Sequence, residues 1–218
     1  MAIPKIIHQT FKTQQLPFIT RWHINHFRKK NPEYKYEFYD DERIEAFFEE
    51  AFEPDVFKCY KKLNIGAAKA DMFRYAILYK KGGIYLDIDS GINDKLDSFI
   101  RPDDTAIITL EGHPSFYAQW ALLYQANHPF LKKTLQKIVE NISLNKYPNN
   151  VHSMTGPGVY TQAINECLAE DPSIAYRLLG TDYNGHLKVK YHFGKFFLYK
   201  KGEHWKKQQQ VKPLLKMD

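Results

Sequence analysis

Cysteine is scarce in the sequence: its 218 residues include only Cys59 and Cys167. Two cysteines cannot form the disulfide framework on which small extracellular domains depend, so a reducing compartment is expected. The sequence has no run of about 18 or more apolar residues, which is the length that a membrane-spanning helix requires. The opening residues, Met-Ala-Ile-Pro-Lys-Ile-Ile-His, also lack the long apolar core of a signal peptide. These absences lead us to expect a cytoplasmic protein.

Internal repeats and low-complexity linkers are also absent. A chain of 218 residues is long enough for one sizeable α/β core but short for two independent domains. Apolar residues make up 44% of the sequence, which is typical of a globular chain and excludes a disordered one. We therefore predict a single domain over residues 1–218, with residues 195–218 as a C-terminal lid or tail.

Positive charge exceeds negative charge, with 31 Lys and Arg residues against 25 Asp and Glu residues, a net charge of +6. This excess favours an anionic partner: a nucleotide diphosphate, an anionic lipid surface or a nucleic acid. The 15 Tyr, 15 Phe and 3 Trp residues suit stacking and sugar contacts as well as a core. The basic tail over residues 206–216 suits a solvated end, a flexible lid or a peripheral contact with an anionic membrane, and the sequence leaves these alternatives open.

Residues 82–89, Gly-Gly-Ile-Tyr-Leu-Asp-Ile-Asp, combine a buried-strand pattern with two acids. Because side chains alternate along a strand, Tyr85, Asp87 and Asp89 are predicted to face the same side. Two unpaired carboxylates on one face would repel each other and lose solvation. A divalent metal ion with oxygen ligands would relieve both costs, so Asp87 and Asp89 are predicted metal ligands.

The preceding residues, 65–81, predict a helix that starts with alanines and ends at a glycine pair. Asp71 and Arg74 lie on one face of this helix because they are one turn apart. The guanidinium of Arg suits phosphate or vicinal hydroxyls, and a carboxylate accepts hydrogen bonds from hydroxyls. Metal, phosphate and sugar hydroxyls together describe a nucleotide sugar. The predicted catalytic residues are Asp71, Arg74, Asp87 and Asp89.

The pattern Asp-x-x-Arg followed by Gly-Gly-x-Tyr-x-Asp-x-Asp, from Asp71 to Asp89, resembles the signature of glycosyltransferase family 32, the DXD-containing sugar transferases. The related large glucosylating bacterial toxins share it. This resemblance implies a GT-A-like α/β domain, in which a central, mostly parallel sheet is flanked by helices and binds the nucleotide at the carboxyl ends of its strands. It further implies a UDP-hexose or GDP-mannose donor, Mn²⁺ or Mg²⁺, and retention of the anomeric configuration.

Both ends of the chain add to the resemblance. Pro-Lys-Ile-Ile-His-Gln-Thr-Phe is similar to the family's opening strand, which implies that Thr10 and Phe11 contact the nucleotide base; the alternative is that they simply end a core strand. Related sequences have a polar residue before a C-terminal Trp, where it helps to hold the metal or the diphosphate. By this resemblance His204 is a metal ligand, which would favour Mn²⁺ over Mg²⁺, and Trp205 closes over the donor. His192 is the alternative ligand.

These expectations define a reaction. The predicted protein transfers mannose, glucose or galactose from a nucleotide diphosphate sugar to a hydroxyl of a glycan or glycolipid, with a divalent metal ion stabilising the leaving diphosphate. Gln119 falls where the family commonly has Asn near the sugar, Thr155 resembles the Thr of a Thr-Gly-Pro motif near the active site, and Glu111 is a reserve nucleophile. The predicted donor-binding residues are Thr10, Phe11, Asp71, Arg74, Tyr85, Asp87 and Trp205.

Three other functions remain compatible with parts of the sequence. Residues 84–91 also resemble the first motif of haloacid-dehalogenase-type phosphatases, in which Asp87 would be the nucleophile. That reading leaves Asp71 and Arg74 unexplained. A nucleic-acid binder would fit the basic charge, but no binding motif or basic stripe supports it, so we expect no nucleic-acid partner. A nucleotide-sugar binder without turnover is the third alternative.

Outside the central motif, hydrophobic periodicity and turn residues predict the other elements. Strands are expected over residues 3–10, 34–39, 105–110, 174–179 and 186–193, with a further strand over 116–124, and helices over residues 18–30, from 40–41 onward, 129–145 and 154–168.

Overall fold

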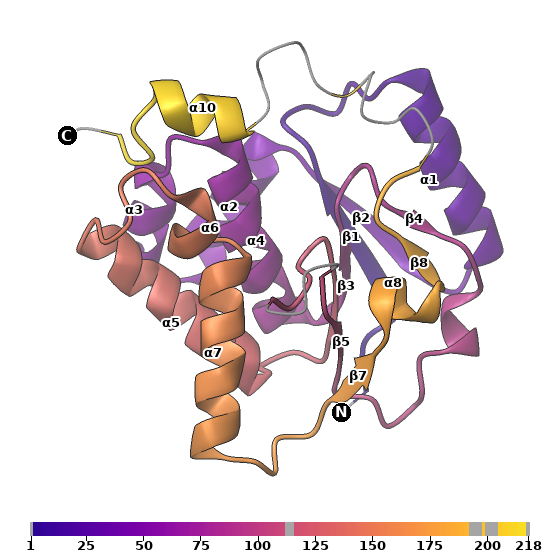
Figure 1. Cartoon of the computed structure of the whole chain (residues 1–218). Helices are drawn as coiled ribbons and strands as arrows, with labels where there is room; N and C mark the ends of the chain where they lie inside the picture. Colours follow the sequence, from indigo (N-terminus) through magenta and orange to yellow (C-terminus); the bar gives the residue numbers. More distant parts are fainter. Residues whose placement is uncertain (1, 112–115, 192–197, 199–204, 217–218) are drawn as a thin grey trace.

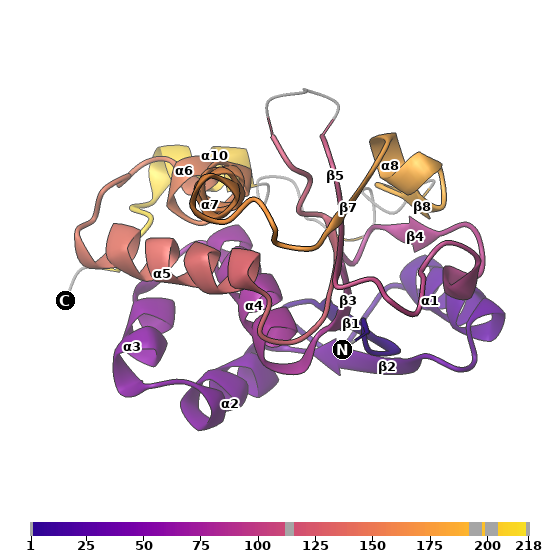
Figure 2. The ribbon, with the colours of Figure 1, turned by 90° about the horizontal axis from the view of Figure 1, so that it is seen from below.

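The structure is a computed structural model that describes residues 2–111, 116–191, 198 and 205–216, with the backbone alone for residues 205–207. Figure 1 shows a central sheet between two unequal groups of helices, and Figure 2 shows the same groups on opposite sides of the sheet from below. None of the helices in this described part combines the length and apolarity needed to cross a membrane.

The central sheet contains β1 (Ile6–Thr10), β2 (Lys35–Tyr39), β3 (Gly83–Leu86), β5 (Ala106–Thr109), β6 (Ala121–Tyr124) and β7 (Arg177–Leu179), in the order β2-β1-β3-β6-β5-β7. β1 runs parallel to β2 and β3, and β5 runs parallel to β7, whereas β6 is antiparallel to both of its neighbours. The predicted α/β class with a mostly parallel sheet is therefore confirmed. A small second sheet pairs β4 (Gly91–Ile92) with β8 (Leu187–Lys188).

Helices cover both faces of the central sheet and are, with one 3₁₀ turn, α1 (Phe18–Lys30), α2 (Asp41–Ala51), α3 (Pro54–Lys62), α4 (Gly66–Lys81), η1 (Leu96–Ser98), α5 (Pro129–Ser143), α6 (Val151–Met154), α7 (Pro157–Glu170), α8 (Thr181–Asn184) and α10 (Trp205–Val211). The larger core lies between the sheet and the group that includes α2, α4, α5 and α7, and the smaller core lies on the side of α1 and α8. In β3, Tyr85 packs in the larger core and Ile84 and Leu86 pack in the smaller one, as strand alternation requires.

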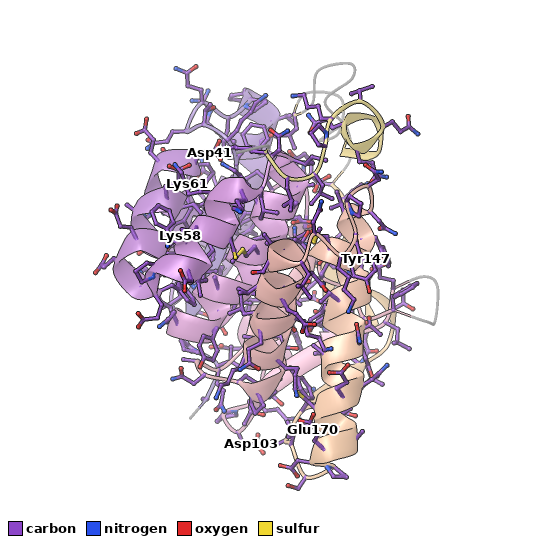
Figure 3. All side chains as sticks on the ribbon, turned by 90° about the vertical axis from the view of Figure 1, so that its left-hand side faces the viewer. Asp41, Lys58, Lys61, Asp103, Tyr147 and Glu170 are labelled. Atoms are coloured by element: carbon purple, nitrogen blue, oxygen red, sulfur yellow. The ribbon has the colours of Figure 1, made fainter. Side chains whose placement is uncertain are left out.

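The outer face of the larger helix group is solvated. Figure 3 shows this face, with Lys58, Lys61 and Glu170 at the surface. Its charges form ion pairs, among them Lys58–Asp55 at 3.2 Å. Exposed pairs of this kind contribute little to stability, about 0–1 kcal/mol each. The polar groups that are buried, and therefore costly, lie elsewhere in the fold.

Several predicted boundaries are wrong in detail. β3 ends at Leu86, not at Asp89, because the carbonyl oxygen of Asp87 accepts a hydrogen bond from the Ser90 backbone N–H at 2.9 Å and closes a turn. Asp87 and Asp89 therefore lie in a loop after the strand. Only the final part of the strand expected over residues 116–124 forms, as β6. Of the strand expected over residues 186–193, the structure describes residues 186–191, and among these only Leu187 and Lys188 pair as a strand. The helix α3 was not predicted.

The turn between α4 and β3 explains why a glycine pair stands there. Gly82 ends α4 with a φ of 64°, and Gly83 follows with a φ of 104°, a region that L side chains rarely adopt. A Cβ atom on Gly83 would also lie 2.6 Å from the carbonyl oxygen of Ile6 in β1. The chain can therefore pass from the helix directly into the centre of the sheet, and this places α4 beside the end of β3.

The buried His128 predicts a pH dependence of stability. It caps α5 by accepting a hydrogen bond from the Phe130 backbone N–H, its residue is 1% exposed, and burial lowers its pKa from 6.5 to about 4. As the pH falls from 6.5 to 4, the unfolded chain takes up a proton that the folded chain does not, so His128 costs stability by about 1.4 kcal/mol per pH unit, up to about 3 kcal/mol.

His128→Asn keeps a capping oxygen and removes the titration, so its free energy of unfolding should fall less than that of the wild type over this pH range. Urea denaturation at several pH values measures the difference. Parallel curves for the two proteins would contradict the assignment.

Candidate active site

A cavity of about 720 Å³ opens beside the carboxyl ends of β1 and β3. This volume is in the range of small-molecule sites, about 300–1,000 Å³. Its lining includes the predicted site residues Thr10, Phe11, Asp71, Arg74, Tyr85, Asp87 and Asp89. The fold therefore brings together residues that lie far apart in the sequence. His192 and His204 lie outside the described residues, as does the side chain of Trp205.

Arg74 is the centre of the hydrogen-bond network in this cavity. Its Nη2 atom lies 3.1 Å from Oδ1 of Asp71 and 3.1 Å from Oδ1 of Asp87. Its Nη1 atom donates to the Gln119 carbonyl oxygen at 2.8 Å, and its guanidinium lies 5.0 Å from the centre of the Tyr85 ring. Because Arg74 is 5% exposed, its charge is held by these protein groups. The structure thus places Arg74 between the two acids that sequence spacing had put in one pocket.

Asp71 is enclosed by protein donors. Its Oδ1 atom accepts a hydrogen bond from Nε2 of Gln119 at 3.1 Å, and its Oδ2 atom accepts one from Oγ1 of Thr155 at 3.0 Å. The Tyr75 hydroxyl donates to Oε1 of Gln119, which turns the amide nitrogen toward Asp71. Burial raises the pKa of Asp71 to about 6, although Arg74 opposes this shift. Gln119 and Thr155 therefore hold Asp71, and Asp71 in turn holds Arg74.

Asp87 and Asp89 lie in the loop after β3 and line the cavity. Oδ1 of Asp87 accepts a hydrogen bond from the Tyr85 hydroxyl at 3.2 Å, and its side chain is 32% exposed. Burial raises the pKa of Asp87, and Arg74 opposes this shift. Burial, and then the charge of Asp87, raises the pKa of Asp89 to about 6. The two acids therefore repel each other across the loop, which a bound cation would reverse.

This pair fits a hard divalent cation, because carboxylate oxygens are the preferred ligands of Mn²⁺ and Mg²⁺. Within the described residues no group of three or more His, Cys, Asp or Glu side chains is placed to hold a metal ion. Asp87 and Asp89 would thus need further ligands from a bound substrate, from solvent or from residues such as His204. The role of His204 remains a prediction.

Thr10 and Phe11, which were predicted to contact the nucleotide base, lie at the end of β1. Oγ1 of Thr10 donates to the Tyr39 carbonyl oxygen at 2.8 Å, and the Phe11 backbone N–H donates to the same oxygen at 3.1 Å. Phe11 is half-buried and lies in the cavity wall. These contacts fix the end of β1 against β2 and leave the base contact a prediction.

A segment late in the sequence, which includes Val189 and Lys190, also lines the cavity. This was not predicted from the sequence. The Tyr191 backbone N–H donates to the Asp89 carbonyl oxygen at 3.0 Å, and Oγ of Ser90 donates to the Val189 carbonyl oxygen at 2.9 Å. Lys190, between these two contacts, lines the cavity. The local sequence Lys-Val-Lys-Tyr does not mark Lys190 as a site residue. Its place in the cavity follows from the tertiary hydrogen bonds of its neighbours, which local sequence patterns do not predict.

Comparison with known proteins identifies the family of this chain. The family model for a glycosyltransferase sugar-binding region containing a DXD motif matches residues 20–107. An uncharacterised glycosyltransferase, L373, of Acanthamoeba polyphaga mimivirus is 31% identical over 185 residues, covering 83% of this chain and 72% of the relative. The chain therefore belongs to the family of DXD-containing glycosyltransferases.

Other relatives are longer proteins. The initiation-specific alpha-1,6-mannosyltransferase of Schizosaccharomyces pombe is 29% identical over 198 residues, covering 76% of this chain and 49% of the relative. The inositol phosphoceramide mannosyltransferase 3 of the same organism is 34% identical over 137 residues, covering 63% of this chain and 37% of the relative. The chain thus spans about half or less of the length of these mannosyltransferases.

Solved structures confirm the fold. The PaToxG glycosyltransferase has a TM-score of 0.66 at 24% identity, covering 78% of this chain and 71% of that one. The UDP-bound glycosyltransferase domain of the YGT toxin has a TM-score of 0.58 at 10% identity, covering 87% of this chain and 83% of that one. The predicted GT-A-like architecture is that of these glycosyltransferases.

Thr155→Val tests the support of Asp71. Valine matches the shape of threonine but leaves Oδ2 of the buried Asp71 without its donor, so the free energy of unfolding should fall by about 1–3 kcal/mol. Thr155→Ser keeps the hydroxyl and serves as the control. Chemical denaturation at neutral pH gives both values, and equal stability of the two variants would show that the hydrogen bond is unimportant.

Proposed function

We propose that this protein transfers a hexose from a nucleotide diphosphate sugar to a hydroxyl group of a glycan or glycolipid, with retention of the anomeric configuration and with the help of a divalent cation. The proposal rests chiefly on one observation: Asp87 and Asp89, with Arg74 behind them, line a cavity at the carboxyl ends of two parallel strands. Such an edge of an α/β sheet is where nucleotides bind.

The names of the relatives support a choice among the possible donor sugars. Two of the relatives above are mannosyltransferases, and one of them acts on an inositol phosphoceramide, so mannose is favoured over glucose and galactose. A protein of the same fold was solved with UDP bound. Both GDP-mannose and a UDP-hexose are therefore the donors to test, and glycans and glycolipids are the acceptors.

In the proposed reaction, the acceptor oxygen forms a bond to the anomeric carbon on the face from which the nucleotide diphosphate leaves. The electron pair of the broken carbon–oxygen bond goes to the diphosphate oxygen, and the acceptor proton passes to the same oxygen. Attack and departure on one face preserve the configuration. Negative charge grows on the diphosphate, so preorganised positive charge beside it lowers the barrier.

The residues have distinct tasks in this proposal. Asp87 and Asp89 would hold Mn²⁺ or Mg²⁺, which when bound supplies Lewis-acid stabilisation of the diphosphate. Arg74 holds Asp87 in place through its 3.1 Å contact and is itself oriented by Asp71. The ring of Phe11, which lines the cavity, would stack on the base.

The phosphatase alternative is less consistent with the site. Arg74 lies 3.1 Å from Oδ1 of Asp87 and 3.1 Å from Oδ1 of Asp71, an arrangement that a nucleophilic Asp87 does not require. Membership of the DXD family also accounts for Asp71 and Arg74, which the phosphatase leaves without a role.

Asp89→Ala tests the proposed cation site. This variant should lose metal-dependent donor hydrolysis by about 100-fold or more, because removal of one electrostatic stabiliser typically costs that much. Its thermal unfolding midpoint should not fall, because burial already disfavours the carboxylate. Hydrolysis of GDP-mannose and UDP-glucose with Mn²⁺ measures activity. Wild-type turnover in the variant would refute the site.

A nucleotide-sugar panel tests the donor. With Mn²⁺ present, the correct donor at about 100 times its Kd should stabilise the native state by about 2.7 kcal/mol and raise the unfolding midpoint accordingly. Differential scanning fluorimetry with GDP-mannose, UDP-glucose and UDP-galactose makes the comparison, and Asp89→Ala is the control. If none of these donors shifted the wild type, the proposed substrate class would be wrong.

A further inference from the structure

We infer that Lys190 is a further catalytic residue, which binds the diphosphate of the donor and stabilises the negative charge on the leaving group. This inference rests on the proposed function. The family signature lies around residues 71–89, and the matched family model ends at residue 107, so neither includes Lys190.

The residues before and after Lys190 are both hydrogen-bonded to the loop that carries Asp87 and Asp89. Backbone or side-chain hydrogen bonds join Val189 to Ser90 and Tyr191 to Asp89, at 2.9 and 3.0 Å. Just before them, β8 pairs with β4, which directly follows the same loop. Lys190 therefore belongs to a strap, residues 187–191, that is hydrogen-bonded to the acidic loop and to β4, and Lys190 lines the cavity.

The strap is also anchored on its outer side. The Tyr191 hydroxyl lies 2.7 Å from Oγ1 of Thr20, and the Tyr191 ring stacks on His23 with the ring centres 4.0 Å apart. Both partners belong to α1, a helix of the smaller core. Lys190 thus starts from a backbone that is held by the acidic loop on one side and by α1 on the other.

Lys190 differs in its partners from Arg74 and Lys69, two other cations that line the cavity. Arg74 is bonded to Asp71 and Asp87, and Lys69 lies 3.7 Å from Glu45 and over the ring of Tyr60. Lys190 has no carboxylate within 4.0 Å among the residues that the structure describes, although its charge acts on both Asp87 and Asp89. Its ammonium group is therefore close to the acidic loop and available to an anionic ligand.

A count of charges shows what this ammonium adds. A divalent cation would be balanced by the carboxylates of Asp87 and Asp89, and Arg74 is balanced by Asp71. The cation site and its support would then be close to neutral as a whole, whereas the departing diphosphate gains negative charge. Lys190 supplies one positive charge beyond this balance, as a point charge with three donors on a flexible stem, which suits phosphate oxygens.

Isothermal titration calorimetry on the full chain with Mn²⁺ tests this role, using GDP and UDP as diphosphate probes and GMP and UMP as monophosphate probes. Lys190→Gln removes the charge, and Lys190→Arg keeps it. Lys188→Gln is the matched control, because Lys188 is also exposed, lies on the same strap and does not line the cavity. Both positions are at the surface, so folding of the three variants should be unaffected.

Lys190→Gln should weaken binding of the diphosphate by about 10-fold or more, which corresponds to about 1.4 kcal/mol, and should change monophosphate binding less. Lys190→Arg should retain most of the diphosphate affinity, and Lys188→Gln should match the wild type. In transfer assays, kcat of Lys190→Gln should also fall, because charge on the leaving group is largest in the transition state.

The outcomes separate the inference from the function on which it rests. Wild-type diphosphate affinity in Lys190→Gln, or an equal loss in Lys188→Gln, would overturn the role of Lys190 and leave the proposed function standing. If the wild type bound neither GDP nor UDP, the proposed function and the inference would fail together.

Discussion

The contact of one buried guanidinium with two carboxylates is the interaction on which the site depends. Arg74 reaches Asp71 in its own helix and Asp87 beyond the next strand, each at 3.1 Å. Burying a charge is expensive unless it is paired and hydrogen-bonded, and removing one partner of such a network typically costs about 3–5 kcal/mol. The Tyr75, Gln119 and Thr155 side chains complete the network around Asp71. The polar centre of the cavity is therefore rigid before any ligand arrives, which is what an electrostatic catalyst requires.

This rigidity originates in the backbone. Gly82 and Gly83 turn α4 sharply into β3, and the Asp87 backbone N–H donates to the Trp120 carbonyl oxygen at 2.7 Å, so the acidic loop leaves the sheet at a fixed point. Trp120 directly precedes β6, which runs antiparallel between β3 and β5 and so brings this oxygen to the end of β3. The single reversed strand of an otherwise parallel arrangement thus positions the first acid of the motif, and the pair of glycines positions the helix that supports it.

The sequence predicted the local part of the site and missed the long-range part, for physical reasons. Asp71 and Arg74 share a helix face and the glycine pair ends that helix, so their proximity to Asp87 follows from short-range geometry. The alternation rule failed at Asp87 and Asp89 because it was extended past Leu86, where a turn replaces the strand. Lys190 could not be predicted, since its place depends on hydrogen bonds to residues about a hundred positions earlier. His204 and Trp205 stay predictions from resemblance.

The strap over residues 187–191 has a consequence for the order in which the parts of the site are synthesised. The acidic loop is synthesised well before the strap that holds its Asp89 carbonyl oxygen and adds an ammonium group beside it. Thr155, which supports Asp71, also comes late in the chain. A nascent chain in which only residues up to about 110 had left the ribosome would carry the complete family signature without the groups that organise it. Competence for chemistry would then arrive only after residues 187–191 had emerged, when the earlier part of the fold is already available to enclose a reactive donor.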